Sequence, residues 1–110
     1  MIRVDAVWLA TQPLDMRAGP DTALMRVVKV FGAAYPHHAY VFANGRCNRI
    51  KILVHDGLGV WLAARRLQRG HFIWSRSVEA GIQISAAQLS ALVIGLPWQQ
   101  IGSAGIISNI

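Results

Sequence analysis

The first third of the chain places a short apolar run before a helical repeat. Val7–Ala10 is apolar and precedes a Thr-Gln-Pro turn, which predicts a short strand. Apolar residues then recur at the spacing of one helical face: Leu24, Val27, Val28 and Phe31. Pro20 and Asp21 are favourable in the first turn of a helix, and Gly32 is favourable just after its end. The pattern therefore predicts a strand and then a helix that begins near residue 20 and ends before Gly32.

The middle of the chain changes to the period of strands. Tyr40–Phe42 and Arg49–Val54 predict a hairpin, whose polar connection through Asn48 is longer than a two-residue turn. Val60–Ala64 and His71–Trp74 predict two further strands, because a glycine-containing turn precedes each of them. We therefore expect an antiparallel meander of about four strands.

A second helical repeat follows residue 85. Ser85 and Gln88 have the form of a capping box, and Gly95 is placed to end the helix. The apolar face of this helix consists of Leu89, Leu92, Val93 and Leu96. Together the patterns predict an α+β fold, in which a small antiparallel β-meander packs with a helix from the N-terminal half and a C-terminal helix. We expect a single domain over residues 1–101 and a variable C-terminal tail over residues 102–110.

Composition supports one globular domain. The chain has 110 residues, of which 54% are hydrophobic and 15% charged, so it has enough apolar material for a core and does not resemble a disordered protein. The single cysteine, Cys47, excludes an intramolecular disulfide. Residues 80–110 carry no charge, but polar residues interrupt them and no basic residues flank them as anchors, so an amphipathic helix is favoured over a membrane span. We expect a cytoplasmic protein without membrane contact.

The positive charge of the chain is concentrated in the predicted meander. The whole sequence has 11 basic and 5 acidic residues, and the segment from Arg46 to Arg76 holds seven of the former and only Asp56 of the latter. Most of the basic residues are arginine, whose planar guanidinium binds phosphate with two parallel hydrogen bonds. This asymmetry favours binding to a polyanion over a plain solvated surface. The candidate contacts are Arg46, Arg49, Lys51, Arg65, Arg66, Arg69, Arg76 and Arg17.

Strand alternation predicts how these side chains are arranged. Arg49 and Lys51 are two residues apart, so they should share one face of the sheet. Arg65 and Arg66 are adjacent and should point to opposite faces, and we expect one of them to pair with an acid such as Asp56. The aromatic residues among them, Trp61, Phe72 and Trp74, are expected in the core, with stacking on single-stranded bases as the alternative.

Enzymatic chemistry has little support in the sequence. Two-metal phosphodiester chemistry needs several convergent carboxylates, whereas most of the five acids here have positions typical of turns and caps. The histidines and Cys47 lack the paired spacing of a zinc site, and a lone cysteine is weak support for a nucleophile. We expect no catalytic activity, cofactor or metal. A hydrolytic alternative would need Asp15 or Asp56 for metal-dependent cleavage.

Several short motifs, taken in order, resemble one protein family over most of the chain. They are Val7–Ala10, Asp15–Arg17, Arg49–Leu53, His55–Gly59, Arg66–Leu67 with Phe72 and Trp74, and Gln88–Leu89 with Trp98. This order resembles the small accessory protein, TnpB or Orf2-like, of the insertion-sequence family sixty-six, which is unrelated to the RNA-guided nuclease that shares the TnpB name. The resemblance implies a bacterial protein of a mobile element that acts beside a separate, larger transposase. Asn48, Gln68 and Leu96 stand where the family usually has acids, so this chain is more basic than the pattern.

The charge and the resemblance together lead to two hypotheses. The first is a non-catalytic accessory protein of transposition that binds DNA through the arginine-rich meander and assists a transposase. The alternative is an adaptor that docks on the transposase, or associates with itself, without touching DNA. The high apolar fraction of the chain motivates this alternative.

Overall fold

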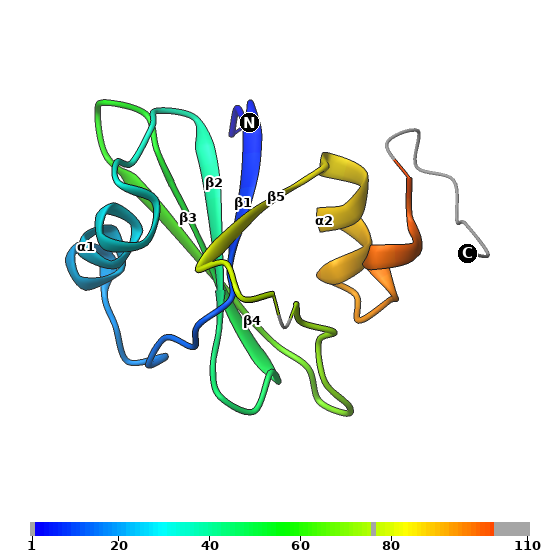
Figure 1. Ribbon diagram of the computed structural model, residues 1–110. Coiled ribbons are helices and arrows are strands. Elements are labelled where there is room, and N and C mark those ends of the chain that lie inside the picture. The colour runs from blue at the N-terminus through cyan, green and yellow to red at the C-terminus, as the bar shows by residue number, and fades with distance from the viewer. Residues whose placement is uncertain (1, 76, 103–110) are drawn as a thin grey trace.

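The computed structural model describes residues 2–75 and 77–102, which form a mixed five-stranded sheet with one helix packed on each face (Figure 1). The α+β prediction is confirmed. In chain order the elements are β1 (Ala6–Ala10), α1 (Pro20–Phe31), β2 (His38–Ala43), β3 (Arg49–His55), β4 (Val60–Arg66), β5 (Gly81–Ile84), α2 (Ala86–Leu92) and the 3-10 turn η1 (Trp98–Gln100).

The strands follow the order β4-β3-β2-β1-β5 across the sheet. Strands β2, β3 and β4 form the predicted meander through antiparallel hairpins. Strand β1 lies parallel to β2, with α1 as the crossover between them, and β5 pairs antiparallel with the other side of β1. The meander therefore supplies three strands of the sheet, and the other two are added at the β1 side.

The prediction of a strand at His71–Trp74 is wrong. Gly70 has a φ of 76°, which turns the chain away from the sheet after β4. Residues 71–74 then form no ladder with any other described residue, although the backbone N–H of Phe72 donates to the carbonyl of Cys47 at 2.6 Å. The apolar pattern of residues 71–74 therefore does not distinguish a strand from a loop that is held by a single backbone hydrogen bond.

Helix α1 has the predicted limits and covers one face of the sheet. Pro20 occupies its first turn, and Gly32 follows it with a φ of 84° and donates its N–H to the carbonyl of Val28 at 2.8 Å. Such a left-handed residue is the usual way to end a helix, and glycine adopts it without strain. Val27 is fully buried on the sheet side of the helix, in a cluster with Tyr40 and other residues.

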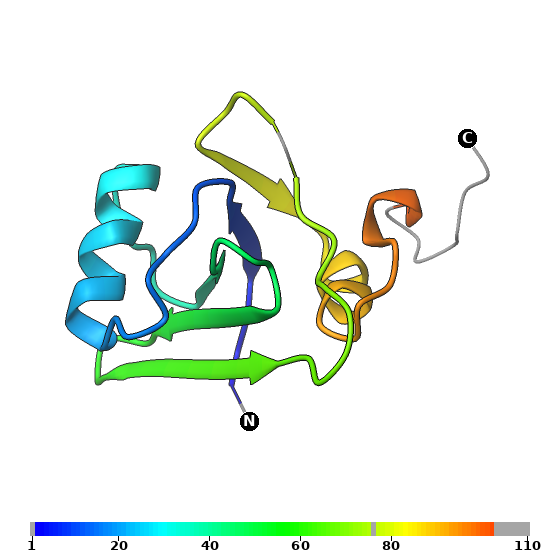
Figure 2. The same cartoon turned by 90° about the horizontal axis from the view of Figure 1, so that it is seen from below.

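The opposite face is covered by α2, η1 and the connection from β4 to β5 (Figure 2). Trp98 is buried there and its indole N–H donates to the carbonyl of Ile73 at 2.6 Å. Phe72 is buried and Trp74 is half-buried, as predicted, and the Trp74 indole N–H donates to the carbonyl of Ala10 at 2.8 Å. Trp61 is different, because it is 54% exposed on the edge strand β4. The prediction that it lies in the core is wrong.

The capping box of α2 gives a stability prediction. The Ser85 hydroxyl accepts from the N–H of Gln88 at 3.1 Å, and the Gln88 side chain accepts from the N–H of Ser85 at 2.8 Å. Because α2 has only seven residues, these two hydrogen bonds satisfy much of its first turn. We expect Ser85→Ala to lower the free energy of unfolding by about 1 kcal/mol, measured by urea denaturation. Ser90→Ala, on the exposed side of the same helix, is the control and should change it by less than about 0.5 kcal/mol.

The uncharged C-terminal region, residues 80–110, begins with a strand and a short helix that belong to the fold. None of the helices in the described residues is long and apolar enough to cross a membrane. Residues 81–84 form β5 and residues 86–92 form α2. Of the predicted tail, residues 103–110 lie outside the described residues.

Candidate nucleic-acid interface

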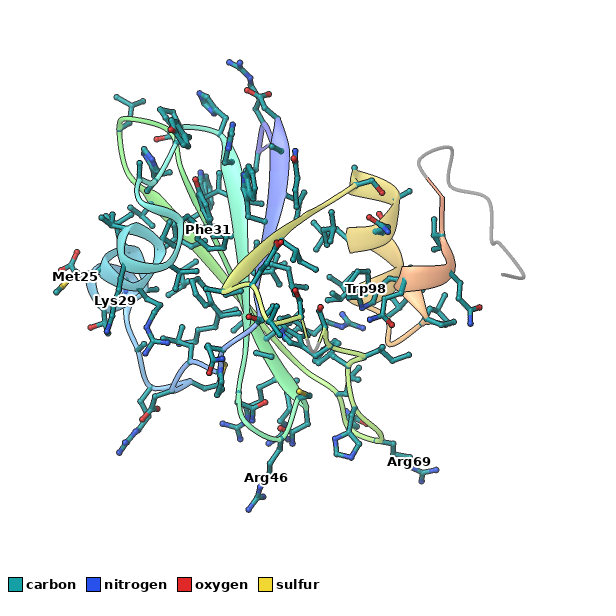
Figure 3. The ribbon with its side chains drawn as sticks, viewed as in Figure 1. Met25, Lys29, Phe31, Arg46, Arg69 and Trp98 are labelled. Carbon is teal, nitrogen blue, oxygen red and sulfur yellow. The ribbon has the colours of Figure 1, made fainter. Side chains whose placement is uncertain are left out.

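Five of the predicted contact residues lie at one end of the β3–β4 hairpin. This group is called the basic end and consists of Arg46, Arg49, Arg65, Arg66 and Arg69, all of them exposed. Arg49 begins β3 and Arg66 ends β4, while Arg46 and Arg69 lie in the adjoining loops. Arg46 and Arg69 both project from this end of the molecule (Figure 3).

Hydrogen bonds join the loop before β3 to the segment after β4 at this end. The N–H of Leu67 donates to the carbonyl of Asn48 at 2.9 Å. A ring nitrogen of His71 lies 2.8 Å from the carbonyl of Arg46, which indicates a further hydrogen bond between the loops. The fold thus holds segments on either side of β3 and β4 together, although they are some 25 residues apart in sequence.

Arg49 and Arg66 lie directly opposite each other in the β3–β4 ladder. Antiparallel pairs alternate between hydrogen-bonded and non-hydrogen-bonded ones, and the backbone bonds from Leu67 to Asn48 and from Asp56 to Gly59 fix the phase of this ladder. By that phase, Arg49 and Arg66 form a non-hydrogen-bonded pair, in which Cα atoms are only about 4.5 Å apart and the side chains are closest. Two like charges in this position destabilise a sheet.

No carboxylate in the described part of the chain neutralises this pair. The ion pairs found in residues 2–75 and 77–102 are Arg3 with Asp5 at 2.9 Å and Arg17 with Asp15 at 2.8 Å. The basic end therefore presents several guanidinium groups to solvent without an acidic partner. An anion that bridges Arg49 and Arg66 would relieve their repulsion and receive hydrogen bonds from both.

Lys51 lies on the same face as Arg49, as the alternation predicted, but its ammonium group has a structural contact. It is half-buried and donates to the carbonyl of Ala18 at 2.7 Å. This bond fixes the segment before α1 against the sheet. Beside it lies a shallow depression of about 340 Å³, lined by Met16, Arg49, Ile50, Lys51, Ala64, Arg65 and Arg66.

Arg17 follows Met16, which lines this depression, but it carries its own counterion. Its guanidinium forms hydrogen bonds with both carboxylate oxygens of Asp15 at 2.8–3.2 Å. These bonds, and one from the backbone N–H of Arg17, lower the pKa of Asp15 to about 2. Asp15 therefore stays ionised throughout the physiological pH range. The spacing of Asp15 and Arg17, two residues apart in a loop, is the sequence signal that could have indicated this neutralisation.

Arg65 and Arg66 point to opposite faces, in agreement with the alternation. Arg65 is paired in register with Ile50, whose side chain is buried in the core beneath α2, whereas Arg66 shares the face of Arg49. The expectation that one of them pairs with Asp56 is wrong. Asp56 lies at the other end of the hairpin, where its carboxylate accepts from the N–H groups of Leu58 and Gly59 at 2.9 and 3.0 Å. These backbone bonds lower the pKa of Asp56.

Arg76 lies outside the described residues. Among the residues that the structure describes, no three histidine, cysteine or acidic side chains come close enough to hold a metal ion. Asp15 and Asp56, the two acids of the hydrolytic alternative, have the ion-pair and turn contacts given above and lie in different loops.

Comparisons with known proteins identify the family. The family described as IS66 Orf2 like protein matches residues 5–103. Two proteins of Sinorhizobium fredii (strain NBRC 101917 / NGR234) are similar to the chain: y4hO is 36% identical over 84% of this chain and 82% of its own, and y4jC is 31% identical over 86% and 82%. Both are described as uncharacterized. No solved structure matches. The chain therefore belongs to the IS66 Orf2-like family of insertion-sequence proteins.

Proposed function

We propose that this protein is a non-catalytic accessory factor of insertion-sequence transposition, which binds DNA through the basic end and assists a separate transposase. Its family associates it with an insertion sequence, whose movement requires proteins to act on DNA. The proposed contacts are mainly to phosphate, because clustered arginines without acidic partners bind the backbone irrespective of sequence.

The opposed pair of Arg49 and Arg66 is the observation that carries this proposal. A purely structural role does not explain two arginines in the closest type of cross-strand pair, since their repulsion reduces stability. A phosphate bound between the two guanidinium groups would remove this repulsion and accept hydrogen bonds from both, so the pair favours binding. Arg46 and Arg69 extend the same end of the hairpin, so a DNA backbone that follows it meets further cations.

The positions of four of the five acidic residues support a non-catalytic role. Asp5 and Asp15 each pair with an arginine two residues away, Asp21 lies in the first turn of α1, and Asp56 stabilises a turn. Each contact is a common structural use of a carboxylate. The transposase is therefore proposed as the partner that performs the chemistry.

The proposal is tested by titrating the purified protein into labelled duplex and single-stranded DNA over a salt series, with fluorescence anisotropy as the readout. We expect micromolar or tighter binding at low salt. If three to five phosphates of duplex DNA are neutralised, the logarithm of the affinity should fall against that of the salt concentration with a slope of about −2.7 to −4.5. An absence of binding, or an affinity that does not change with salt, would overturn the mechanism.

Removing the counterion of Arg17 should strengthen binding. In Asp15→Asn the guanidinium of Arg17 loses its ionic partner and becomes available to phosphate beside the depression. We expect an affinity gain of about threefold and a salt slope steeper by about one, because one more phosphate is neutralised. The anisotropy titration above measures both. Because the pKa of Asp15 is about 2, lowering the pH to 5 should not produce the same gain in the unmodified protein.

Asp5→Asn is the matched control for this gain. It releases Arg3 from the same kind of ion pair and changes the net charge equally, but near the N-terminal end of β1. If both variants gain equally, net charge rather than the position of Arg17 explains the effect.

The second candidate function is an adaptor that docks on the transposase without touching DNA. An exposed apolar area at the other end of the β3–β4 hairpin favours it: Leu58 is 97% exposed and Val28 on α1 is 47% exposed. Both line a shallow hollow with Leu24 and Val60. This candidate predicts co-purification with the transposase at a salt concentration that removes DNA, and loss of the complex in Leu58→Lys.

A further inference from the structure

Strand β4 is an edge of the sheet that none of the other described elements covers. It is last in the strand order, and six of its seven residues are exposed (Figure 2). Its register with β3 is continuous over all seven residues, so no bulge interrupts it, and it contains no proline. Natural proteins usually protect such edges with bulges, prolines or charges, because an unpaired edge pairs readily with another strand. The only charges here are Arg65 and Arg66, both at one end.

The backbone groups that β4 offers can be derived from its ladder. The bonds from Leu67 to Asn48 and from Asp56 to Gly59 mean that odd-numbered residues of β4 direct their N–H and C=O groups toward β3. The even-numbered residues then direct theirs away from the sheet. These outward residues are Val60, Leu62, Ala64 and Arg66.

We propose that β4 pairs antiparallel with β4 of a second copy of this chain, to form a dimer with one continuous sheet. If Ala63 lies opposite Ala63 of the partner, all seven residues of each strand are paired. In that register, Val60 lies opposite Arg66 and Leu62 lies opposite Ala64 of the other copy. Both are pairs of outward residues, so the backbone donors and acceptors of the two edges match.

Charge complementarity selects the antiparallel arrangement. A parallel pair would place Arg65 and Arg66 of one copy beside the same residues of the other. In the antiparallel pair they meet the uncharged end of the partner strand, and Arg65 lies opposite Trp61 on the same face. Trp61 is 54% exposed in the single chain. A guanidinium on an indole face is a favourable cation–π contact, and it accounts for a tryptophan on an otherwise exposed edge.

The symmetry of this dimer determines where the two basic ends lie. The two-fold axis of such a dimer runs perpendicular to the sheet, so both copies present their Arg49–Arg66 pairs on the same face. Six residue steps along a strand, at about 3.3 Å each, separate the two Arg66 positions by about 20 Å along the strand direction. The dimer itself does not depend on DNA binding, and it is tested without nucleic acid.

Sedimentation velocity in about 1 M salt is the first test, over roughly 2–200 µM protein, a range that covers micromolar dimers. We expect a monomer–dimer equilibrium within this range. Trp61→Arg places an arginine opposite Arg65 of the partner and should weaken the dimer at least tenfold, whereas Trp61→Phe should retain most of the affinity. The circular dichroism spectrum of each variant verifies folding. A monomer at every concentration would overturn the proposal.

Disulfide trapping tests the register independently. In a Cys47→Ser background, Ala63→Cys puts two cysteines across the axis in a non-hydrogen-bonded pair, with Cα atoms about 4.5 Å apart, which is within the range for a disulfide. Ala64→Cys is the matched control, because its two copies lie diagonally and more than about 7 Å apart, beyond that range. We expect rapid cross-linking of the first variant under mild oxidation and at least tenfold slower cross-linking of the second. Equal rates would reject this register and with it the proposed dimer.

Discussion

Replacing both Arg49 and Arg66 by alanine is expected to weaken DNA binding at least tenfold near 0.1 M salt. The two side chains lie directly opposite each other in the β3–β4 ladder, and no carboxylate of the described residues forms an ion pair with them. Removing two phosphate contacts should also make the salt slope shallower by about 1.8. Affinity and slope come from the same anisotropy titration.

The same double variant is expected to fold at least as stably as the unmodified protein. The variant lacks the directly opposed like charges, which should raise the free energy of unfolding by a few tenths of a kcal/mol. The lower strand propensity of alanine should offset part of this gain. A loss of affinity together with unchanged or higher stability is the result expected of a binding site. If the pair had only a structural role, the double variant would lose stability as well as DNA affinity.

Arg26→Ala/Lys29→Ala is the matched control for this experiment. It removes two positive charges from α1, a helix that lies away from Arg46 and Arg69 of the basic end (Figure 3). If this control reduces affinity as much as Arg49→Ala/Arg66→Ala, binding depends on net charge and the basic end is not its site.

The sequence predicted elements whose signals are local. The limits of α1 follow from Pro20 and Gly32, and the capping box of α2 from Ser85 and Gln88, because these residues satisfy backbone groups of their own helix. The β2–β3 hairpin is set by a polar loop between two alternating segments. Each of these features depends on residues within one turn or one loop.

Features that depend on distant partners were missed. Trp61 has the pattern of a core residue, but β4 became an edge strand, and no local property of the strand determines its place in the sheet. Strand β5 is a four-residue segment whose partner, β1, precedes it by about 70 residues. The Arg49–Arg66 pairing is similar, because alternation gives the face of each arginine but only the register places them opposite each other.

Gly81 in β5 should tolerate even a small substitution poorly. A Cβ atom there would overlap the ring of Phe31, the last residue of α1. The ring cannot move freely, because it packs against Trp8 and Tyr40 with centroid separations of 6.0 and 5.1 Å. Gly81→Ala must displace the ring or separate β5 from β1. We expect the free energy of unfolding to fall by about 2–3 kcal/mol, the cost typical of overpacking.

Two further variants show whether the Phe31 contact causes this loss. Gly45→Ala introduces the same methyl group at a position where no described residue beyond the chain neighbours lies within 4 Å, so urea denaturation should show a change of less than about 1 kcal/mol. Phe31→Leu shortens the obstructing side chain. In the double variant Gly81→Ala/Phe31→Leu, the loss of unfolding free energy should therefore be smaller than the sum of the losses in the two single variants. Additive losses would mean that Gly81 is required for its backbone rather than for the ring above it. A sub-additive result would establish that α1 and the edge strand β5 are joined through one aromatic ring, a contact between segments about 50 residues apart.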